Sequence, residues 1–271
     1  MYQHTYVRDH VFSGGVRLDR GDIRSHSMGV EVDYGLTDAL SIGGGMPYIA
    51  ARYRGSAPHA HAGGRTQDDG RYHGGLQDLR LELRYGAIDS AVAVTPFVAV
   101  IVPADDYEYF AHSAIGVRLR EAQLGASIGF VRPRFYLQGR YAYGVSQRVI
   151  GRRRNRSTVD AEAGFFLGPR VRVFAFELGQ VTHGGLEIRP GLAGLTAQEL
   201  PHHDRLGRAN ILDVGGGAAV AVAPSMDVVV SALRNVGGDN IHAAQYALTV
   251  GASWGFGRPS GAGHHAPAST R

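Results

Sequence analysis

Apolar side chains recur at every second position through most of this chain, and stretches with helical spacing are scarce. Residues 78–85, which read DLRLELRY, are the clearest example, because every leucine there is flanked by charged residues. In residues 246–256 the same alternation ends on Trp254 and Phe256. A strand directs successive side chains to opposite faces, so this period predicts strands with one apolar and one polar face. The chain is therefore expected to be all-β.

Segments with this alternation cover most of the sequence. The stronger ones are residues 28–36, 78–85, 121–130, 135–146, 159–167, 174–179, 212–222 and 246–256. The weaker ones are residues 2–8, 40–50, 91–102 and 225–236. Together they predict about twelve strands of about ten residues, the length of a tilted strand that crosses a membrane. The alternation also places Phe174, Phe176 and Leu178 on the apolar face of their strand and Glu177 on the polar face.

The connections between these strands differ in length in a regular way. Short turns rich in Gly, Pro and Asp alternate with longer connections. The longer ones are residues 9–23, 53–75, 103–114, 149–157, 184–207 and 237–242. An up-and-down antiparallel barrel in an outer membrane has this rhythm, with short turns in the periplasm and longer loops outside. The sequence thus favours a transmembrane β-barrel in which residues 246–256 pair with the first strand and leave no edge.

Charged residues occupy the middle of many strands, opposite the apolar positions. In a membrane barrel the apolar face contacts lipid, so the charged face is expected to line the lumen. These predicted lumen-lining residues are Glu31, Asp33, Asp78, Arg80, Glu82, Arg84, Arg140, Asp160, Glu162, Glu177 and Asp213. Acids and arginines are mixed among them, which predicts pairing across strands rather than the ring of one sign that a strongly selective filter requires.

The composition excludes several other classes of protein. No run of about eighteen apolar residues is present, so no transmembrane helix is expected. The absence of cysteine excludes disulfides and cysteine catalysis. All positive charge is arginine, and the isoelectric point near 9.5 suits an anionic surface. The one dense basic run, residues 152–156, has no accompanying nucleic-acid-binding motif. The expected partners are outer-membrane lipid, lipopolysaccharide and a small-molecule solute, and not nucleic acid.

One region of the chain carries a family resemblance. Its motifs are YGLTD at residues 34–38, MPY at residues 46–48, GGLQDL at residues 74–79, RY at residues 84–85 and PAD at residues 103–105. The pattern resembles the bacterial outer-membrane barrels linked to transport in the MetA pathway of phenol degradation, although Gln77 stands where that family usually has glycine. The resemblance is most specific over residues 28–105. It implies a membrane barrel that takes up small hydrophobic or aromatic compounds.

The two ends of the chain lead to separate expectations. Residues 1–257 are predicted to form the barrel, and residues 258–271, with His264 and His265, a disordered tail in the periplasm. The start of the sequence lacks the basic and apolar segments of a signal peptide. An outer-membrane protein needs such a segment, so a membrane barrel implies either that the sequence is a mature form or that its start codon was assigned downstream of the true one. The alternative, without a leader, is a soluble β-barrel that binds a ligand.

Histidines near the long connections are the remaining candidates for chemistry. They are His59, His61, His73, His112, His183, His202, His203 and His242. Imidazoles grouped with an acid bind zinc, copper or nickel. The best candidates for a metal site are His183, His202, His203 and Asp204. Adjacent histidines point apart on an extended strand, and no helical pair of the metalloprotease type is present, so we interpret these residues as surface loop residues and predict no metal and no cofactor.

The whole pattern favours a passive outer-membrane channel over an enzyme. Serine, histidine and aspartate are present, but no spacing singles out a catalytic set. The expected mechanism is diffusion of small solutes through a charged lumen, with residues 53–75 and 184–207 constricting the outer mouth. The alternative is a barrel that does not transport, and that binds a ligand or metal through its histidine-rich loops.

Overall fold

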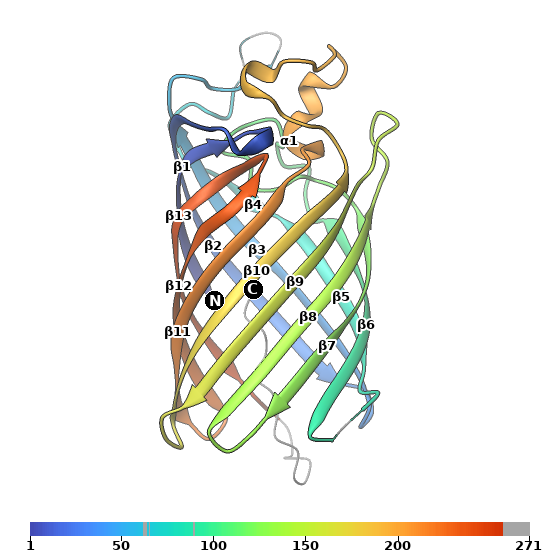
Figure 1. Ribbon diagram of the computed structural model, residues 1–271, viewed down its shortest axis with the longest axis vertical. Helices are drawn as coiled ribbons and strands as arrows, with labels where there is room; N and C mark the ends of the chain where they lie inside the picture. The colour runs from blue at the N-terminus through green and yellow to red at the C-terminus, as the bar shows by residue number, and fades with distance from the viewer. Residues whose placement is uncertain (62–63, 65, 89, 257–271) are drawn as a thin grey trace.

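The computed structural model describes residues 1–61, 64, 66–88 and 90–256, which form a closed barrel of antiparallel strands (Figure 1). The strands are β1 (Tyr2–Val11), β2 (Arg17–Gly35), β3 (Leu40–Arg54), β4 (His73–Leu76), β5 (Asp78–Tyr85), β6 (Val92–Pro103), β7 (Glu121–Val131), β8 (Phe135–Ser146), β9 (Arg154–Phe166), β10 (Val171–Gly184), β11 (Asn210–Ala223), β12 (Met226–Asp239) and β13 (Ile241–Trp254). Neighbours around the ring follow one another in the sequence, and β1 pairs with β13 to close it. The prediction of an all-β up-and-down barrel is confirmed.

The short strands β4 and β5 share one place in the ring. β4 pairs with residues 48–51 of β3 and β5 pairs with residues 40–45, so the two lie end to end along the same neighbour. Gln77 separates them, and its backbone N–H donates to the Pro47 carbonyl at 2.9 Å. The thirteen strand segments therefore make a barrel of twelve strands, as the sequence predicts.

The connections are sorted by length between the two ends of the barrel (Figure 1). The short turns, all at one end, are residues 36–39, 86–91, 132–134, 167–170 and 224–225. The longer connections at the other end are residues 55–72, 104–120, 147–153 and 185–209. The last of these contains the short helices η2 (Pro190–Leu192), η3 (Leu200–His202) and α1 (His203–Leu206).

Two of the expected loops are strands instead. β1 and β2 continue as a hairpin up to η1 (Ser13–Gly15), and β12 and β13 are joined through Asn240 alone, whose φ of 51° makes the tight turn. The prediction of long loops at residues 9–23 and 237–242 is therefore wrong. Only single apolar residues of these strand ends, such as Val11 and Ile241, pack in a buried cluster, so no sustained alternation marks them.

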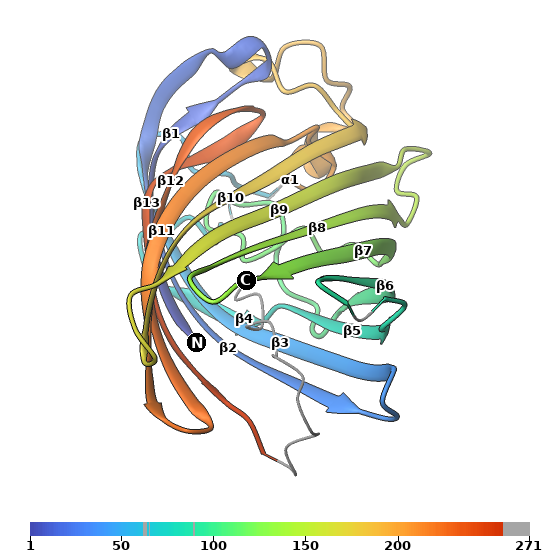
Figure 2. The same ribbon diagram turned by 60° about the horizontal axis from the view of Figure 1, so that its bottom comes forward.

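Large apolar side chains cover the outside of the barrel. Val30, Leu124 and Val230 are 70%, 65% and 57% exposed, whereas Glu82 on the inner face is only 3% exposed. Figure 2 shows the strands enclosing the interior, viewed towards the end with the short turns. Such a wall, apolar outside and charged inside, has the polarity that a lipid environment requires.

The closing strand ends with aromatic residues at the short-turn end. Trp254 pairs with Met226, which directly follows the turn at residues 224–225. Phe256 follows and is 78% exposed. The expected tail, with His264 and His265, lies outside the described residues. Within the described part of the chain, no helix has the length and hydrophobicity needed to cross a membrane.

One strand has the opposite phase from the sequence prediction. Phe176 pairs with Glu162, which borders the cavity inside the barrel. Paired residues of an antiparallel sheet share a face, so Phe174, Phe176 and Leu178 point inward. The prediction that they lie on the lipid-facing side is wrong. The ring of Phe176 occupies the space in which a side chain at Gly215 of β11 would lie, so the glycine makes room for it inside.

Candidate functional site

A cavity of about 300 Å³ lies inside the barrel. It is bordered by nine of the eleven charged residues that the sequence assigns to the lumen. These nine are Glu31, Asp33, Arg80, Glu82, Arg84, Arg140, Asp160, Glu162 and Glu177. Phe174 and Phe176 of β10 also border it, so the cavity has both charged and aromatic surroundings.

Glu82 of β5 is the centre of a charged network beside this cavity. Arg84 donates to one carboxylate oxygen at 2.6 Å, Arg140 of β8 donates to the other at 2.6 Å, and Arg80 donates to the latter as well. Because Glu82 is buried, its charge would be costly without these partners. The period-two spacing places Arg80 and Arg84 on the same face of β5 as Glu82, and Arg140 of β8 reaches them over the inner faces of β6 and β7.

Further contacts fix the arginines of this network. Arg84 also donates to Asp33 of β2 at 2.7 Å. The guanidinium carbon of Arg140 lies 3.5 Å from the centre of the Phe97 ring, which is a cation–π contact. This side of the inner wall therefore carries charges in fixed positions and of both signs.

Asp78 and Asp213 do not border the cavity and have other partners. The hydroxyl of Tyr107, from the connection between β6 and β7, donates to Asp78 at 2.6 Å. The side-chain amide of Asn235 on β12 donates to Asp213 at 2.9 Å. One carboxylate thus holds a loop to the wall and the other joins two strands. Their predicted role in the lumen stays a prediction.

Glu177 borders the cavity but belongs to the outward row of β10. It pairs with Ala161 and Val214, while its neighbour Phe176 points inward. Its side chain therefore points to the outside of the barrel, which corrects its placement on the lumen face. The sequence predicts the alternation along β10 correctly. It assigns the two faces the wrong way round, because apolar phenylalanines are expected to face lipid and a glutamate is expected to face the lumen.

The long connections pack against one another at the other end of the barrel (Figure 1). Arg205 of residues 185–209 donates to the carbonyl of Arg118 in residues 104–120 at 2.5 Å. Its guanidinium also lies 4.3 Å from the centre of the Tyr109 ring. The loops at this mouth therefore hold one another in place rather than extending separately into solvent.

Asp68 joins the first of these loops to the second. Its carboxylate accepts the backbone N–H groups of His59 and His112 at 3.0 Å each, and the N–H and hydroxyl of Ser113 at 2.9 and 2.8 Å. Burial alone would raise the pKa of Asp68, but the hydrogen bonds from His59, Ser113 and His112 outweigh it and hold the pKa well below its ordinary value. Asp68 is therefore a charged anchor for two loop backbones.

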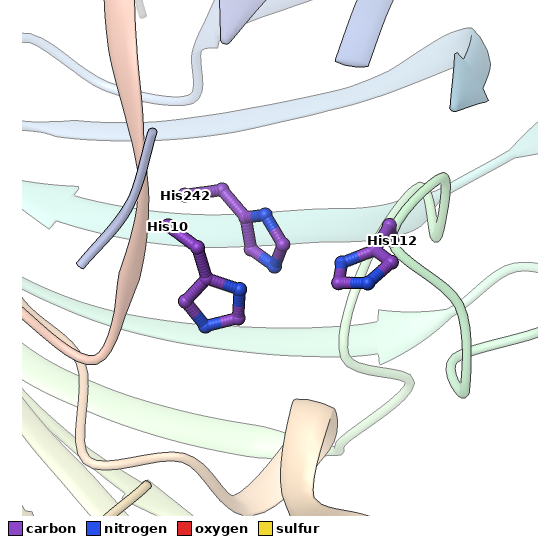
Figure 3. Close-up of side chains that lie close together, drawn as sticks. All are labelled: His10, His112 and His242. Atoms are coloured by element: carbon purple, nitrogen blue, oxygen red, sulfur yellow. The ribbon is translucent and has the colours of Figure 1, made fainter. Parts of the chain in front are cut away.

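Five histidines gather at the junction of these loops with the wall. Figure 3 shows three of them, His10 of β1, His242 of β13 and His112 of residues 104–120, with their rings around a common space. The ring centre of His242 lies 4.4 Å from that of His10 and 5.2 Å from that of His112. His59 continues the row, with its ring centre 4.1 Å from His112 and 4.9 Å from His203. The row runs from the wall to α1.

The two loop histidines in the middle of this row have opposite tendencies to bind a proton. Burial, together with the neighbouring His59, lowers the pKa of His112 to about 3. Burial also acts to lower the pKa of His59, but Asp68 and Asp204 outweigh it and raise that pKa above its ordinary value. Burial raises the pKa of Asp204. Of these two histidines, His59 is thus the one that binds a proton more readily.

Three sets of these side chains offer ligand atoms close together. The sets are His10, His112 and His242; His59, Asp68 and His112; and His59, His203 and Asp204. Within each set the ligand atoms lie within 4.8 Å of one another. Imidazole and carboxylate groups grouped in this way can hold a transition metal.

Only two of the four metal candidates expected from the sequence, His203 and Asp204, belong to these sets. His202 is turned away and lies 3.1 Å from the hydroxyl of Tyr109. His183 contacts a serine of β9 instead. The two adjacent histidines do diverge, although they lie in η3 and α1 and not on an extended strand as the sequence reasoning assumed, and His203 still reaches a cluster.

Sequence reasoning missed two members of the clusters. His10 lies in a segment expected to be loop, and it faces the cluster because β1 continues to Val11. Asp68 lies in a glycine-rich connection with no alternation to place it. No spacing in the sequence links these residues to the others, because His10 comes from β1 and Asp68, although it shares a connection with His59, lies in a segment without periodicity.

The barrel has the fold of known outer-membrane proteins. No family model and no curated protein matches the sequence. An outer membrane channel from Pseudomonas putida has a TM-score of 0.68 at 13% identity, over 92% of this chain and 90% of that one. The NanC porin has a TM-score of 0.53 at 9% identity, over 94% and 98%. The translocator domain of the autotransporter NalP from Neisseria meningitidis has a TM-score of 0.52 at 13% identity, over 94% and 86%. At such identities the likeness shows the fold alone.

Proposed function

We propose that this barrel is an outer-membrane channel through which small solutes diffuse passively. The observation that carries the proposal is the distribution of side chains across the wall. Large apolar residues cover the outside, and charged residues border a cavity inside. A soluble barrel would bury its apolar face, whereas a transmembrane barrel turns that face to lipid. The fold shared with an outer membrane channel of Pseudomonas putida supports the same proposal.

An outward group of tyrosines and arginines supports contact with lipopolysaccharide. The hydroxyls of Tyr2 and Tyr72 lie 2.6 and 3.2 Å from the two ring nitrogens of His26. Arg52 lies over the ring of Tyr72, 4.9 Å from its centre. Aromatic residues with polar tips favour a membrane interface, and arginine suits anionic headgroups. We propose that the long loops face the cell exterior and the short turns face the periplasm.

The solutes that we propose are small organic compounds with an apolar or aromatic part. Phe174 and Phe176 border the cavity on β10, and the Glu82 network lies nearly opposite in the ring. A passage with one aromatic side and one charged side suits molecules that combine a ring with polar groups. The family resemblance of residues 28–105 implies the same class.

We propose that the loops at the outer mouth control the passage of solutes. Residues 53–75 and 184–207 contain the loops that meet there, and the Nε2 atoms of His59 and His203 join them at 3.1 Å. An open cavity of about 600 Å³ lies between residues 103–120 and Arg205 of residues 184–207. We propose this cavity as the entrance, with the loop contacts deciding how far it connects inward.

The proposal assigns no catalytic role to the loop cluster. Ser113 and His112 are neighbours, but both bond to Asp68, and the serine hydroxyl donates to the carboxylate. A catalytic serine instead needs its hydroxyl within reach of an imidazole base that a third group orients. The cluster therefore lacks the order of contacts that nucleophilic catalysis uses.

Conductance in planar lipid bilayers tests the channel proposal. The refolded barrel is expected to give discrete current steps. A variant in which a Gly-Ser linker replaces residues 187–205 should give larger steps, because part of the outer cover is gone. Replacing the short turn at residues 167–170 by the same kind of linker is the control and should leave the step size unchanged.

Two outcomes count against the proposal. A refolded barrel that never conducts, with or without residues 187–205, would reject passive transport. Steps seen only in the shortened variant would favour the second candidate, a closed barrel that binds a ligand through its loops. The mutual packing of those loops is the observation that keeps this second candidate in view.

A further inference from the structure

We propose that the outer loops bind one divalent transition-metal ion, with Zn²⁺ as the reference ion, between His59, His203 and Asp204. The ligands come from residues 55–72 and 185–209, two connections that are distant in the sequence. The site lies among the loops and does not border the central cavity. Metal binding is therefore a property separate from the proposed channel function.

The ligand atoms already have nearly the spacing of a tetrahedral site. Nε2 of His59 lies 3.1 Å from Nε2 of His203. One Asp204 oxygen lies 3.2 Å from Nε2 of His203, and the other lies 3.9 Å from Nε2 of His59. Ligand atoms bound to zinc at about 2.0–2.1 Å in a tetrahedron lie roughly 3.3 Å from one another. A cation between these three groups therefore requires only small movements and leaves a fourth position open.

A hydrogen bond orients the imidazole of His203, and a longer contact with a carboxylate lies behind the imidazole of His59. The Leu200 carbonyl can only accept a hydrogen bond, so Nδ1 of His203, 2.7 Å away, carries the proton and Nε2 keeps its lone pair. On the far side of His59, an oxygen of Asp68 lies 3.5 Å from Nδ1. Carbonyl or carboxylate partners on the second ring nitrogen are the usual outer contacts of histidines that bind metals.

The arrangement of protons makes the His59–His203 contact unfavourable for neutral rings without a cation. If Nδ1 of His59 carries its proton toward Asp68, two bare Nε2 atoms face each other. If the proton is on Nε2 instead, the Nδ1 lone pair faces the Asp68 carboxylate. A metal ion resolves both cases, because it accepts both Nε2 lone pairs and leaves Nδ1–H for Asp68. A second proton on His59 is the competing solution, and a metal ion has to displace that proton when it binds.

Asp204 provides an independent indication. Its Oδ2 atom is buried and has no hydrogen-bond partner among the described residues. A buried carboxylate oxygen without a partner is costly, and a bound cation removes that cost. His203 beside it is 2% exposed, so the site is shielded from solvent on that side. Two imidazoles and a carboxylate suit Zn²⁺, Cu²⁺ or Ni²⁺ better than Ca²⁺ or Mg²⁺, which prefer oxygen ligands throughout.

Calorimetric titration of the refolded full-length barrel with Zn²⁺ tests the site. All samples carry His264→Ala and His265→Ala, so that these two histidines contribute no binding. We expect one ion per barrel. His203→Ala and Asp204→Asn should each weaken binding at least about 100-fold, and Asp68→Asn, which removes an outer contact, about 10–100-fold. His202→Ala is the matched control, because His202 is adjacent but turned toward Tyr109, and it should bind like the parent.

Two further measurements separate loss of the site from loss of the fold. The heat-dependent gel mobility of the barrel should be the same for every variant. X-ray absorption at the zinc edge should show two imidazoles and oxygen ligands in the parent and one imidazole in His203→Ala. Absence of Zn²⁺ binding to the parent would overturn the proposal, as would equal losses in His202→Ala and His203→Ala. Loss of binding in His10→Ala with retention in His203→Ala would overturn it too, by placing the ion at the three histidines of Figure 3.

Discussion

Two buried polar clusters of this barrel differ in how completely their carboxylates are paired. On the wall, Glu82 receives hydrogen bonds from three arginines, and both of its oxygens have partners. In the loops, Oδ2 of Asp204 and Nδ1 of His112 are buried without a hydrogen-bond partner among the described residues. Buried polar groups are normally paired, so unpaired ones call for an explanation. The wall cluster is explained as a structural ion network, whereas the loop cluster has the features of a binding site.

The largest effect is expected from removing the charge of Glu82. In Glu82→Gln, three arginines lose their common anion, and breaking a buried ion pair costs about 3–5 kcal/mol. The free energy of unfolding in denaturant, followed by fluorescence of the single tryptophan, measures this loss. Glu177→Gln is the control, because that side chain lies on the outward row, and its change should stay within about 0.5 kcal/mol. Equal losses in both variants would contradict the assigned role of the network.

A smaller effect is expected from adding Zn²⁺, which acts on the loop cluster. At a free concentration of 100 times the Kd, a ligand stabilises the form that binds it by about 2.7 kcal/mol. Protease cleavage within residues 185–209 should therefore slow by about 100-fold when cleavage requires the loop to detach. Limited proteolysis with and without Zn²⁺ measures the difference. Undiminished protection in His203→Ala would show that the ion acts elsewhere.

Asp68→Asn should loosen the loops without unfolding the wall. Leaving buried hydrogen-bonding groups without their charged acceptor costs about 1–3 kcal/mol. Hydrogen exchange should accelerate at the amides of His112 and Ser113, which donate to Asp68, and stay slow in the barrel strands. Equal acceleration in loops and strands would mean that the loop cluster and the wall unfold as one unit.

The hydrogen bonds to Asp68 also predict how the packing of the outer loops depends on pH. The pKa of Asp68 is lowered in the folded protein, because its hydrogen bonds outweigh the effect of burial. Its contribution is therefore fully present above the ordinary carboxyl pKa of about 3.9 and is lost as the pH falls through the lowered folded value. Loop protection measured by proteolysis with an acid-active protease should persist at pH 4 and decline below it. Asp68→Asn should remove this dependence.

The same contrast explains how much could be predicted from the sequence. The wall follows a local rule, so the spacing within DLRLELRY alone is enough to place Arg80, Glu82 and Arg84 together on one inner face. The rule fixes alternation but not its phase, which is why the predicted faces of Phe174 and Glu177 are exchanged. A glycine-rich neighbouring strand is the signal that sets this phase, since it leaves room inside for aromatic rings.

The loop cluster follows no such local rule. His59 and His203 are 144 residues apart, and each belongs to a connection with no periodicity. Their contact depends on how three loops pack and on the single turn of α1, which turns His203 inward and His202 away. The sequence could therefore indicate histidine-rich loops but not which histidines meet. Sites of this kind become visible only when the distances between loops are known.

The smallest expected effect concerns the selectivity of the lumen between cations and anions. The inward charged residues that border the cavity comprise five acids and three arginines. They are Glu31, Asp33, Glu82, Asp160 and Glu162, and Arg80, Arg84 and Arg140. Because the arginines compensate most of the negative charge, only a weak preference for cations is expected. The reversal potential in a KCl gradient should therefore be small, with the sign of a cation-selective channel. Glu162→Gln should reduce it, whereas Glu177→Gln should leave it unchanged. A strong anion preference would mean that the arginines around Glu82 act as an exposed positive ring, and it would remove the distinction between the wall cluster, in which both oxygens of Glu82 are paired, and the loop cluster, in which Oδ2 of Asp204 is not.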